Sequence, residues 1–179
     1  MNTYALRSFL SPDNVRLHTD YLNILKDTHS INEKSIPEIK GKTPFEISRS
    51  SLKEKDKTEI LLNFISIKSH ETYFSSFTLT PAVCPALRKY YSSEAAFLFE
   101  LATVAKDTNS DFLYVRVLRG RPEIVPSRDA SDVYVTWSPL LALDLCEHAY
   151  FLDYRFRRDD YIRRALEHLD LSLLSAHLK

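Results

Sequence analysis

The chain has 179 residues, 44% of them hydrophobic, which is enough for one well-buried domain or for two small halves that share an interface. Its 24 Lys and Arg residues balance its 24 Asp and Glu residues, so the formal net charge is zero. Proteins that hold nucleic acid usually carry a basic surplus, at least as a patch, and we therefore expect no nucleic-acid partner. Glycine occurs only twice, which argues against a glycine-rich phosphate loop.

The cysteine content and the apolar runs bear on the cellular compartment. Two cysteines, Cys84 and Cys146, suggest no disulfide framework and fit a reducing environment. The first 14 residues include Arg7 and no sustained apolar run, so we expect no secretory signal. No apolar run approaches the roughly 18 residues that a membrane span needs. We therefore expect a protein of the cytoplasm or of an organelle interior that has no membrane partner and is not secreted.

A first helix is predicted to begin near the N-terminus. Ser11 can cap it, and Pro12 suits its first turn. Residues at helical spacing then form one apolar face: Val15, His18, Leu22 and Leu25. The polar, lysine-rich segment 30–58 follows, interrupted by prolines and a glycine. It is predicted to be an exposed connection, partly disordered.

A second helix is indicated by the most regular pattern in the chain. Its apolar face ends before Pro81 and consists of Ile60, Phe64, Ile67, His70, Phe74 and Phe77. A histidine again lies in the middle of an apolar stripe. Two long helices joined by a polar segment predict an antiparallel helical hairpin.

The pattern changes after the second helix. Ser92 or Ser93 can cap a helix, and residues 111–118 and 132–137 are β-branched and aromatic enough to be strands. The prolines between these two runs indicate a loop, and helical spacing returns from Cys146 onward. The sequence thus predicts an α+β protein with an N-terminal helical hairpin at 1–82 and a C-terminal α/β domain at 83–179.

Three histidines and one aspartate stand out because each lies on a face that its element should bury: His18, His70, Asp144 and His148. A single histidine on an apolar face is more often a hydrogen-bonded core residue than a ligand, and Asp144 with Glu147 could cap the last helix. Four such residues, all on faces that should be buried, are harder to explain as unrelated coincidences. Three imidazoles and one carboxylate suit a first-row metal ion with one position left for solvent. The remaining histidines are predicted to be surface residues: His29, His168 and His177.

Four runs of sequence contain or adjoin these residues. "DLCEHAY" at 144–150 matches the pattern Asp-x-x-Glu-His-Ala-Tyr, and "FLDYRFRRDDYI" follows it at 151–162. "YALRSFLSPDNVRLH" ends at His18, and "HETYFSSFTLTP" begins at His70. All four resemble motifs of the iron/manganese superoxide dismutases, and the likeness extends over nearly the whole chain. Within it, the 151–162 run resembles an arginine-rich turn before the family's last helix.

This resemblance implies a fold, a metal and a reaction. The fold would be a helical hairpin followed by an α/β half with a small antiparallel sheet. One Fe or Mn ion per chain would be held by His18, His70, Asp144 and His148, and the antioxidant reaction would convert superoxide to dioxygen and hydrogen peroxide. Glu147 would reach across a homodimer interface to the partner's ligand histidine, so the resemblance implies a homodimer through the Glu147/His148 region. It does not choose between iron and manganese.

The chain departs from the family pattern around the expected ligands. The family's active-site tyrosine falls on Lys26, its gateway histidine on Leu22, and the tyrosine that meets this histidine on Phe151. The glutamine that normally binds metal-bound solvent falls on Ser66 or on Arg128. Other pocket positions hold smaller side chains than usual: Phe74, Phe112, Tyr114 and Cys146. The residues predicted to surround the ligands and to take part in catalysis are Lys26, Arg128 and Glu147.

Three hypotheses follow. The first is a superoxide dismutase, slow or unusually tuned. The second is a non-catalytic protein that keeps the fold, and with it the metal, for a structural, sensing or partner-binding role. The third is a different redox or peroxide chemistry with Lys26 or Cys146 as a participant, although the neighbouring Glu147 disfavours a Cys146 thiolate and a buried packing role is expected.

Overall fold

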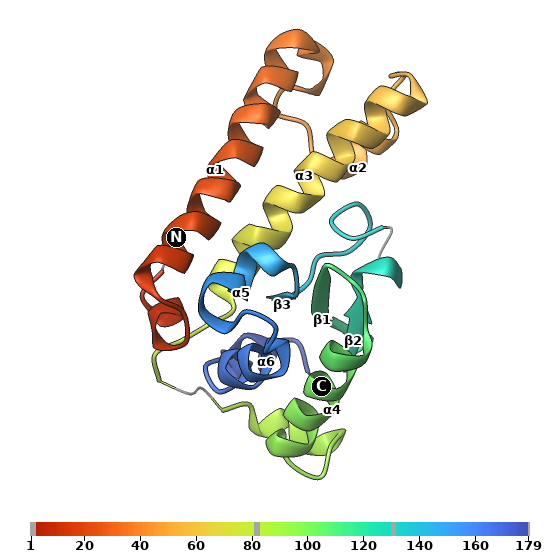
Figure 1. Ribbon diagram of the computed structural model, residues 1–179. Coiled ribbons are helices and arrows are strands. Elements are labelled where there is room, and N and C mark those ends of the chain that lie inside the picture. Colours follow the sequence, from red (N-terminus) through yellow and green to blue (C-terminus); the bar gives the residue numbers. More distant parts are fainter. Residues whose placement is uncertain (1–2, 81–82, 130–131, 179) are drawn as a thin grey trace.

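Figure 1 shows the computed structural model, which describes residues 3–80, 83–129 and 132–178. The helices are α1 (Pro12–Ser35), α2 (Pro44–Ser48), α3 (Glu54–Ser75), α4 (Glu94–Asp107), α5 (Glu147–Tyr154) and α6 (Arg158–Leu166). The strands are β1 (Phe112–Leu118), β2 (Arg121–Pro126) and β3 (Leu141–Asp144). Short 3₁₀ helices lie at Ala5–Ser8, Pro37–Ile39, Pro85–Lys89, Ser127–Asp129 and Leu171–Leu174.

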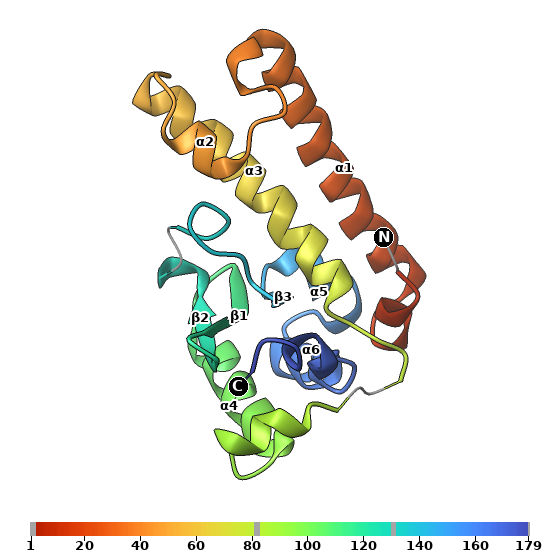
Figure 2. The same ribbon diagram turned by 180° about the vertical axis from the view of Figure 1, so that it is seen from behind.

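The predicted helical hairpin is confirmed. α1 and α3 run antiparallel and lie side by side, and they project away from the rest of the molecule (Figures 1 and 2). The Ser11 hydroxyl accepts a hydrogen bond from the Asn14 amide at 3.2 Å, as expected of a helix N-cap. His18 and Leu22 are buried on α1, and His70 is buried on α3. Both histidines therefore face inward near the base of the hairpin.

Segment 30–58 connects the two long helices and is mostly exposed, as predicted, but it is ordered into helical elements, so the predicted partial disorder is wrong. α1 continues through Ser35, and the short helix α2 begins with a capping box between Thr43 and Glu46. Ile39, Ile47 and Ile60 form a second small core, each at most 2% exposed. Three dispersed isoleucines become a core only when α2 folds back on α3, and a local pattern cannot show this contact.

The sheet has the order β2-β1-β3 and is antiparallel throughout. The strand predicted at 111–118 is confirmed as β1, the central strand. β2 was predicted to be a loop because of its prolines, but it lies at the sheet edge, where a missing N–H is tolerated. Arg119 and Gly120 both have positive φ, +52° and +81°, which suits the tight two-residue turn between β1 and β2.

The strand predicted at 132–137 is wrong, because these residues form turns with one isolated bridge between Val133 and Trp137. Asp132 organises them: its carboxylate accepts hydrogen bonds from the Thr136 hydroxyl and, at 2.7 Å, from the Trp137 indole N–H. Tyr134 has a φ of +59°, and its hydroxyl donates to the Lys68 carbonyl on α3 at 2.9 Å. These side-chain hydrogen bonds override the β propensity of the run.

The C-terminal helices surround the base of the hairpin. Ser93 caps α4 as predicted, and the helical region after Cys146 is split into α5 and α6 by Arg155, whose φ is +53°. The main hydrophobic cluster includes residues from both halves, for example Leu22 and Phe97. The α+β class with a small antiparallel sheet is confirmed. The division between residues 82 and 83 stays a prediction, and residue 82 lies outside the described residues.

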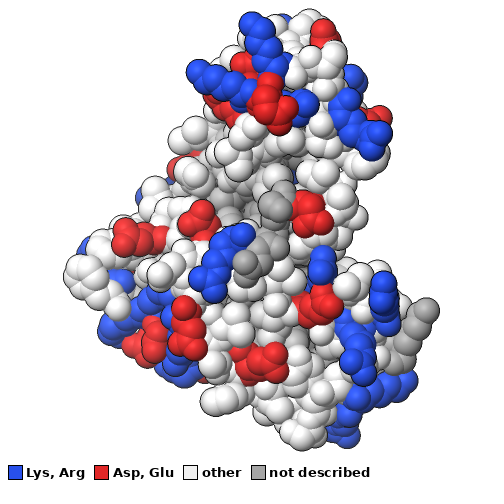
Figure 3. Space-filling view, turned by 90° about the vertical axis from the view of Figure 1, so that its right-hand side faces the viewer, with Lys and Arg blue, Asp and Glu red and all other residues white. Residues whose placement is uncertain are grey.

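Charges of both signs are mixed on the surface. Figure 3 shows Lys and Arg side chains interleaved with Asp and Glu at the tip of the hairpin. At the end of α6, Glu167 accepts hydrogen bonds from Arg163 at 3.0 Å and from Arg164 at 2.7 Å. Among the described residues, no helix combines the length and the apolar content needed to cross a membrane.

We expect the isoleucine core at the tip to be a separately opening unit. Replacing the fully buried Ile47 by Ala removes packing worth about 2–5 kcal/mol, so backbone amides in 39–60 should exchange with solvent at least about tenfold faster. Hydrogen exchange with mass spectrometry measures this. Phe45→Ala, in the same helix but 47% exposed, is the control. Unchanged exchange in Ile47→Ala would show that segment 30–58 is not held by this core.

Candidate metal centre

The first expected ligand, His18, lies on the inner face of α1. Its side chain is 0% exposed, and its ring packs against the rings of Tyr73 and Phe74 on α3, with centroids 4.9 and 5.0 Å away. The amphipathic spacing of α1 explains this placement, because His18 occupies the same stripe as Val15 and Leu22. The imidazole is therefore held by apolar packing at the base of the hairpin.

The second expected ligand, His70, lies near the end of α3 and is 1% exposed. Its Nδ1 lies 2.7 Å from the carbonyl oxygen of Ser66, one turn earlier in the helix. A carbonyl can only accept, so Nδ1 carries the proton and Nε2 is left with its lone pair directed away from the helix. The family resemblance aligns Ser66 with the glutamine that binds metal-bound solvent. In the structure, its backbone carbonyl instead fixes the tautomer of His70.

Asp144 is the last residue of β3 and is fully buried. Its Oδ1 accepts a hydrogen bond from the Cys146 amide at 2.9 Å, and its backbone carbonyl accepts one from the Tyr161 hydroxyl at 2.7 Å. The Tyr73 hydroxyl lies 3.2 Å from that of Tyr161. These contacts fix both the main chain and the side chain of Asp144, which leaves its Oδ2 facing the histidines.

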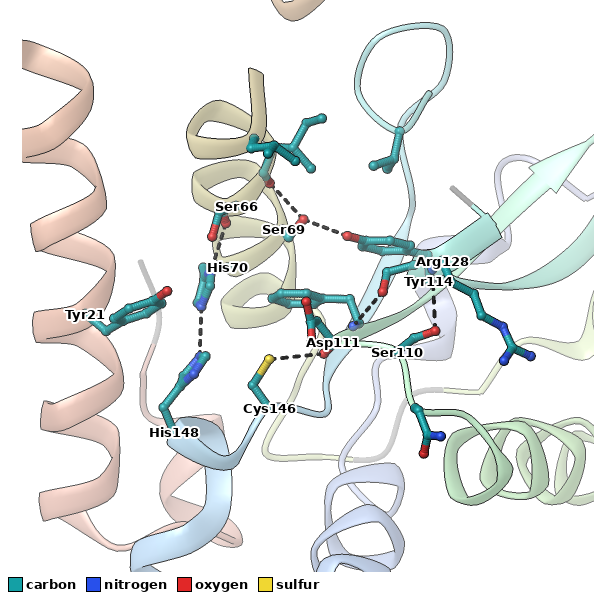
Figure 4. Close-up of a pocket in the computed structure, with 16 residues that line it drawn as sticks. Tyr21, Ser66, Ser69, His70, Ser110, Asp111, Tyr114, Arg128, Cys146 and His148 are labelled. Carbon is teal, nitrogen blue, oxygen red and sulfur yellow. Dashed lines mark hydrogen bonds between the residues drawn. The ribbon is translucent and has the colours of Figure 1, made fainter. Parts of the chain in front are cut away.

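His148 lies in the first turn of α5, four residues after Asp144, and its side chain is 26% exposed. Its Nε2 lies 3.1 Å from Asp144 Oδ2 and 3.2 Å from His70 Nε2. Figure 4 shows His70 and His148 facing each other from α3 and α5. The strand-to-helix connection at 144–148 therefore brings a carboxylate and an imidazole to the same point.

All four donors converge, as the sequence predicts. Asp144 Oδ2 lies 3.1 Å from His18 Nε2, 3.4 Å from His70 Nε2 and 3.1 Å from His148 Nε2. One donor atom from each residue lies within 4.8 Å of all the others. Bonds from zinc to imidazole nitrogen or carboxylate oxygen are about 2.0–2.2 Å long, so ligands that share one such ion stand about 3–4 Å apart. The three separations from Asp144 Oδ2 fall within this range.

The surroundings of His18 test whether an ion fits. Neither of its buried ring nitrogens has a hydrogen-bond partner among the described residues, because the Nε2–Oδ2 approach to Asp144 lacks hydrogen-bond geometry. A buried imidazole without partners is costly. Three imidazoles and one carboxylate aimed at one point satisfy a first-row ion, and the ion in turn satisfies them. The residues present therefore fit a single metal ion.

Burial and mutual contact shift the pKa values of this cluster. Burial alone would raise the pKa of Asp144, but the hydrogen bond from His148 and the close approach of the His18 ring outweigh burial and hold this pKa well below its usual range. Burial lowers the pKa of His70, although the Asp144 carboxylate opposes this effect. An ionised Asp144 carboxylate and a neutral His70 imidazole are the forms that metal coordination requires.

A cavity of about 440 Å³ opens beside the cluster. Its inner wall includes His70, His148 and the hydrogen-bonded pair of Ser69 and Tyr114, whose hydroxyl oxygens are 2.8 Å apart. Apolar contributors include Leu62, Ile65, Phe112 and Val133, and polar ones include Ser66, Asn109, Ser110, Asp111, Ser127 and Arg128. A small molecule therefore has a path to two of the four candidate ligands.

The three residues expected around the ligands lie in different places. Lys26 is half exposed and forms an ion pair with Glu71, Nζ to Oε1 2.9 Å, so it contacts the neighbour of His70 rather than the cavity wall. Arg128 lines the outer part of the cavity, and Figure 4 shows its side chain leading away from the histidines. Glu147 is exposed beside His148. The structure thus brings none of their charged groups into the cluster itself.

The sequence-based reading missed one residue of the site, Tyr21. Its ring lies 4.5 Å from that of His148 and 5.3 Å from that of His70, centroid to centroid. Burial raises the pKa of its hydroxyl, and the Cys146 thiol and the Asp144 carboxylate add to this shift. Tyr21 comes three residues after His18, so it lies on the same side of α1 one turn later. That spacing could have identified it.

Other single-residue expectations have mixed outcomes. Cys146 is only partly buried and lines the cavity, and burial raises the pKa of its thiol, so a packing role describes it incompletely. The expectation that all three remaining histidines lie at the surface is wrong for two of them. His29 packs against Phe64, and His168 stacks on Phe9, with centroids 5.0 and 5.9 Å apart. Only His177 is exposed.

The fold and the four donors define an α+β protein with a site for one metal ion at the base of a helical hairpin. A sequence model of the C-terminal domain of iron/manganese superoxide dismutases matches residues 79–176. The chain therefore belongs to this family. Its membership and the donor cluster together support one Fe or Mn ion as the cofactor.

Individual relatives are similar over different extents of the chain. Superoxide dismutase [Mn/Fe] of Rickettsia prowazekii is 26% identical over 164 residues, 85% of this chain and 74% of that protein. Superoxide dismutase [Fe] of Synechococcus elongatus is 24% identical over 182 residues, 92% of this chain and 86% of that protein. Superoxide dismutase [Fe] 1, chloroplastic, of rice is 66% identical over 52 residues, 28% of this chain, and the match spans only 13% of the rice protein.

We expect the protein to bind about one Fe or Mn ion per chain. His18→Gln and Asp144→Asn should each weaken the affinity by more than tenfold, since even partners that only support a ligand contribute about 10–100-fold. Elemental analysis and chelator competition measure this, with circular dichroism to verify folding. His177→Gln changes an exposed histidine and is the control. Equal metal content in all variants would mean that the ion binds elsewhere.

Proposed function

We propose that this protein is a superoxide dismutase whose Fe or Mn ion is held by His18, His70, Asp144 and His148. The observation that carries the proposal is the convergence of these four donors at a buried point that an open cavity reaches. A site for dismutation needs a one-electron metal and access for a small anion. The chain combines both features, and its family membership points to the same chemistry.

The bound ion supplies one-electron chemistry: two superoxide anions and two protons give one dioxygen and one hydrogen peroxide. The chain's own residues set the conditions for this reaction. The Asp144 carboxylate offsets one positive charge of the ion, and the Ser66 carbonyl keeps His70 Nε2 free to coordinate. The cavity is wide enough for a diatomic anion and lined in part by hydroxyl groups. Those hydroxyls can donate hydrogen bonds to an entering anion.

Lys26 and Arg128 enter the proposal as indirect contributors. Lys26 and Lys68 both pair with Glu71. Lys26 Nζ lies 2.9 Å from Oε1 of the carboxylate, and Lys68 Nζ lies 2.9 Å from Oε2. This arrangement ties α1 to α3 beside His70 and can hold the base of the hairpin together. Arg128, at the outer part of the cavity, adds a positive charge where an anion would enter. Neither residue lies where it could exchange a proton with a ligand directly.

A non-catalytic role is the second candidate, and a specific observation favours it. In the family, a tyrosine and a glutamine act close to the metal, whereas the corresponding Lys26 and Arg128 side chains are directed elsewhere and Ser66 serves through its backbone. A protein that keeps all four ligands but has different residues around them could keep the ion for structure or sensing. This alternative predicts metal binding without rapid turnover.

A dismutation assay separates the two candidates. We expect protein loaded with Fe or with Mn to remove superoxide faster than an equal concentration of the free ion, and His18→Gln to lose this excess because its donor set is incomplete. Pulse radiolysis or stopped-flow absorption measures the rate. The control is His177→Gln, which should retain the wild-type rate. Metal-loaded protein no faster than the free ion would support the non-catalytic role instead.

We further propose a homodimer formed through the surface around Glu147 and His148. Glu147 is exposed, and Phe151 lies four residues later on the same side of α5. Phe156, 92% exposed, packs edge-on against Phe151 at 5.6 Å. An exposed carboxylate beside a half-exposed ligand and an aromatic pair suit a contact between two copies, in which Glu147 could accept a hydrogen bond from the partner's ligand histidine.

The dimer proposal predicts a position-specific effect of charge. Phe156→Lys should shift the protein from dimer to monomer, because a cation would replace an aromatic side chain in the contact. Phe99→Lys is the matched control, since Phe99 is also highly exposed, at 75%, but lies on α4. Sedimentation equilibrium over a range of concentrations measures the association. A monomeric wild type, or equal effects of both substitutions, would contradict this interface.

The compartment forms the last part of the proposal. We place the protein in the cytoplasm or an organelle interior, where thiols such as Cys84 and Cys146 stay reduced. Similar proteins of rice and Arabidopsis thaliana are described as chloroplastic, which supports the organelle option. Cell fractionation distinguishes the two.

A further inference from the structure

The four candidate ligands are not supported equally. His18, His70 and Asp144 have side chains at most 1% exposed, and His70 and Asp144 are each fixed by a backbone group. His148 is 26% exposed and lies in the first turn of an eight-residue helix. The hydrogen bonds described for it go through Nε2, the atom that would bind the ion. Its ring therefore depends on packing for its orientation.

Tyr21 provides that packing. The rings of Tyr21, His70 and His148 form a triangle with centroid separations of 4.5, 5.3 and 5.4 Å, and each ring comes from a different helix. Figure 4 shows the phenol of Tyr21 beside both imidazoles, with its hydroxyl end directed toward them. Tyr21 also lines the cavity. One side chain of α1 thus contacts the least supported ligand and borders the space through which an anion would reach the metal.

We propose that Tyr21 is a positioning residue of the metal centre, with two separable roles. Its ring holds His148 in the orientation that coordination requires. Its hydroxyl donates a hydrogen bond to a small anion bound in the cavity beside the metal. The inference rests on the proposed function. It gives Tyr21, three residues after His18, a role beside the metal that Lys26 cannot fill, because Lys26 lies outside the cavity wall. A ring without a hydroxyl would keep only the first role.

Two substitutions of Tyr21 separate these roles. Tyr21→Ala removes both ring and hydroxyl, and we expect the affinity for Mn²⁺ or Fe²⁺ to fall about tenfold, the lower range for groups that orient a metal ligand. Tyr21→Phe keeps the ring, and we expect ion affinity within twofold of the wild type. Chelator competition measures these affinities without any assay of activity. Ile24→Ala, at a position on α1 that is 62% exposed, is the control and should change nothing.

Azide is the probe for the second role. Its binding to the Fe- or Mn-loaded protein is followed by absorption or electron paramagnetic resonance, and Tyr21→Phe should weaken it about fivefold through loss of one hydrogen bond. Wild-type ion affinity in Tyr21→Ala would overturn the positioning role, and wild-type azide affinity in Tyr21→Phe would overturn the donor role. A wild-type protein that binds neither ion would overturn the proposed function itself. If the protein dismutates superoxide but the Tyr21 variants keep the wild-type affinities for the ion and for azide, this inference alone is overturned.

Discussion

The centre of this structure is one buried carboxylate with three imidazoles around its Oδ2. Asp144 has no exposed surface, and its Oδ2 lies between 3.1 and 3.4 Å from a ring nitrogen of each histidine. An ionised group in such a place is tolerated only when its charge is compensated. Hydrogen bonds alone do not satisfy the cluster, because His18 has no hydrogen-bond partner in the part of the chain that the structure describes. A shared ion compensates the charge of Asp144 and gives His18 Nε2 a partner, and the surrounding elements hold the four donors where they can share it.

Each element that meets at the cluster is fixed by contacts outside it. β3 pairs with the central strand β1, and its Ala142 amide donates a hydrogen bond at 2.9 Å to the hydroxyl of Ser76, the residue that follows α3. α1 is tied to α5 through Asp153, whose carboxylate accepts from the Ser11 amide at 2.8 Å and from the Asn14 side chain at 3.1 Å. The Asp144 main chain is held by Tyr161 of α6. A site whose ligands come from three segments gains geometric precision from this support.

How much the sequence predicts depends on the range of the interaction that decides each feature. His18 and His70 could be found because a helix buries every third or fourth residue, and Asp144 and His148 because a carboxylate and an imidazole four residues apart follow an apolar run in a family-like motif. β2 was missed because its prolines are tolerated only at the edge of a sheet, and the edge position of a strand is a tertiary property. The turn at 132–137 was missed because one Asp132 carboxylate overrides a β-rich run. The Ile39 core and the orientation of Arg128 likewise depend on contacts that no local pattern contains.

The four ligands and the residues behind them differ in how much change they tolerate. A missing ligand leaves the remaining buried polar groups unsatisfied, whereas a smaller residue behind the ligands only enlarges a cavity. Ser66, Phe112 and Cys146 line that cavity, which reaches His70 and His148. With space on one side, His148 needs support on another, and the Tyr21 ring of α1 packs against it with centroids 4.5 Å apart. The open cavity and the tyrosine thus act on the same ligand: the cavity leaves His148 partly exposed, and the ring of Tyr21 packs against it on another side.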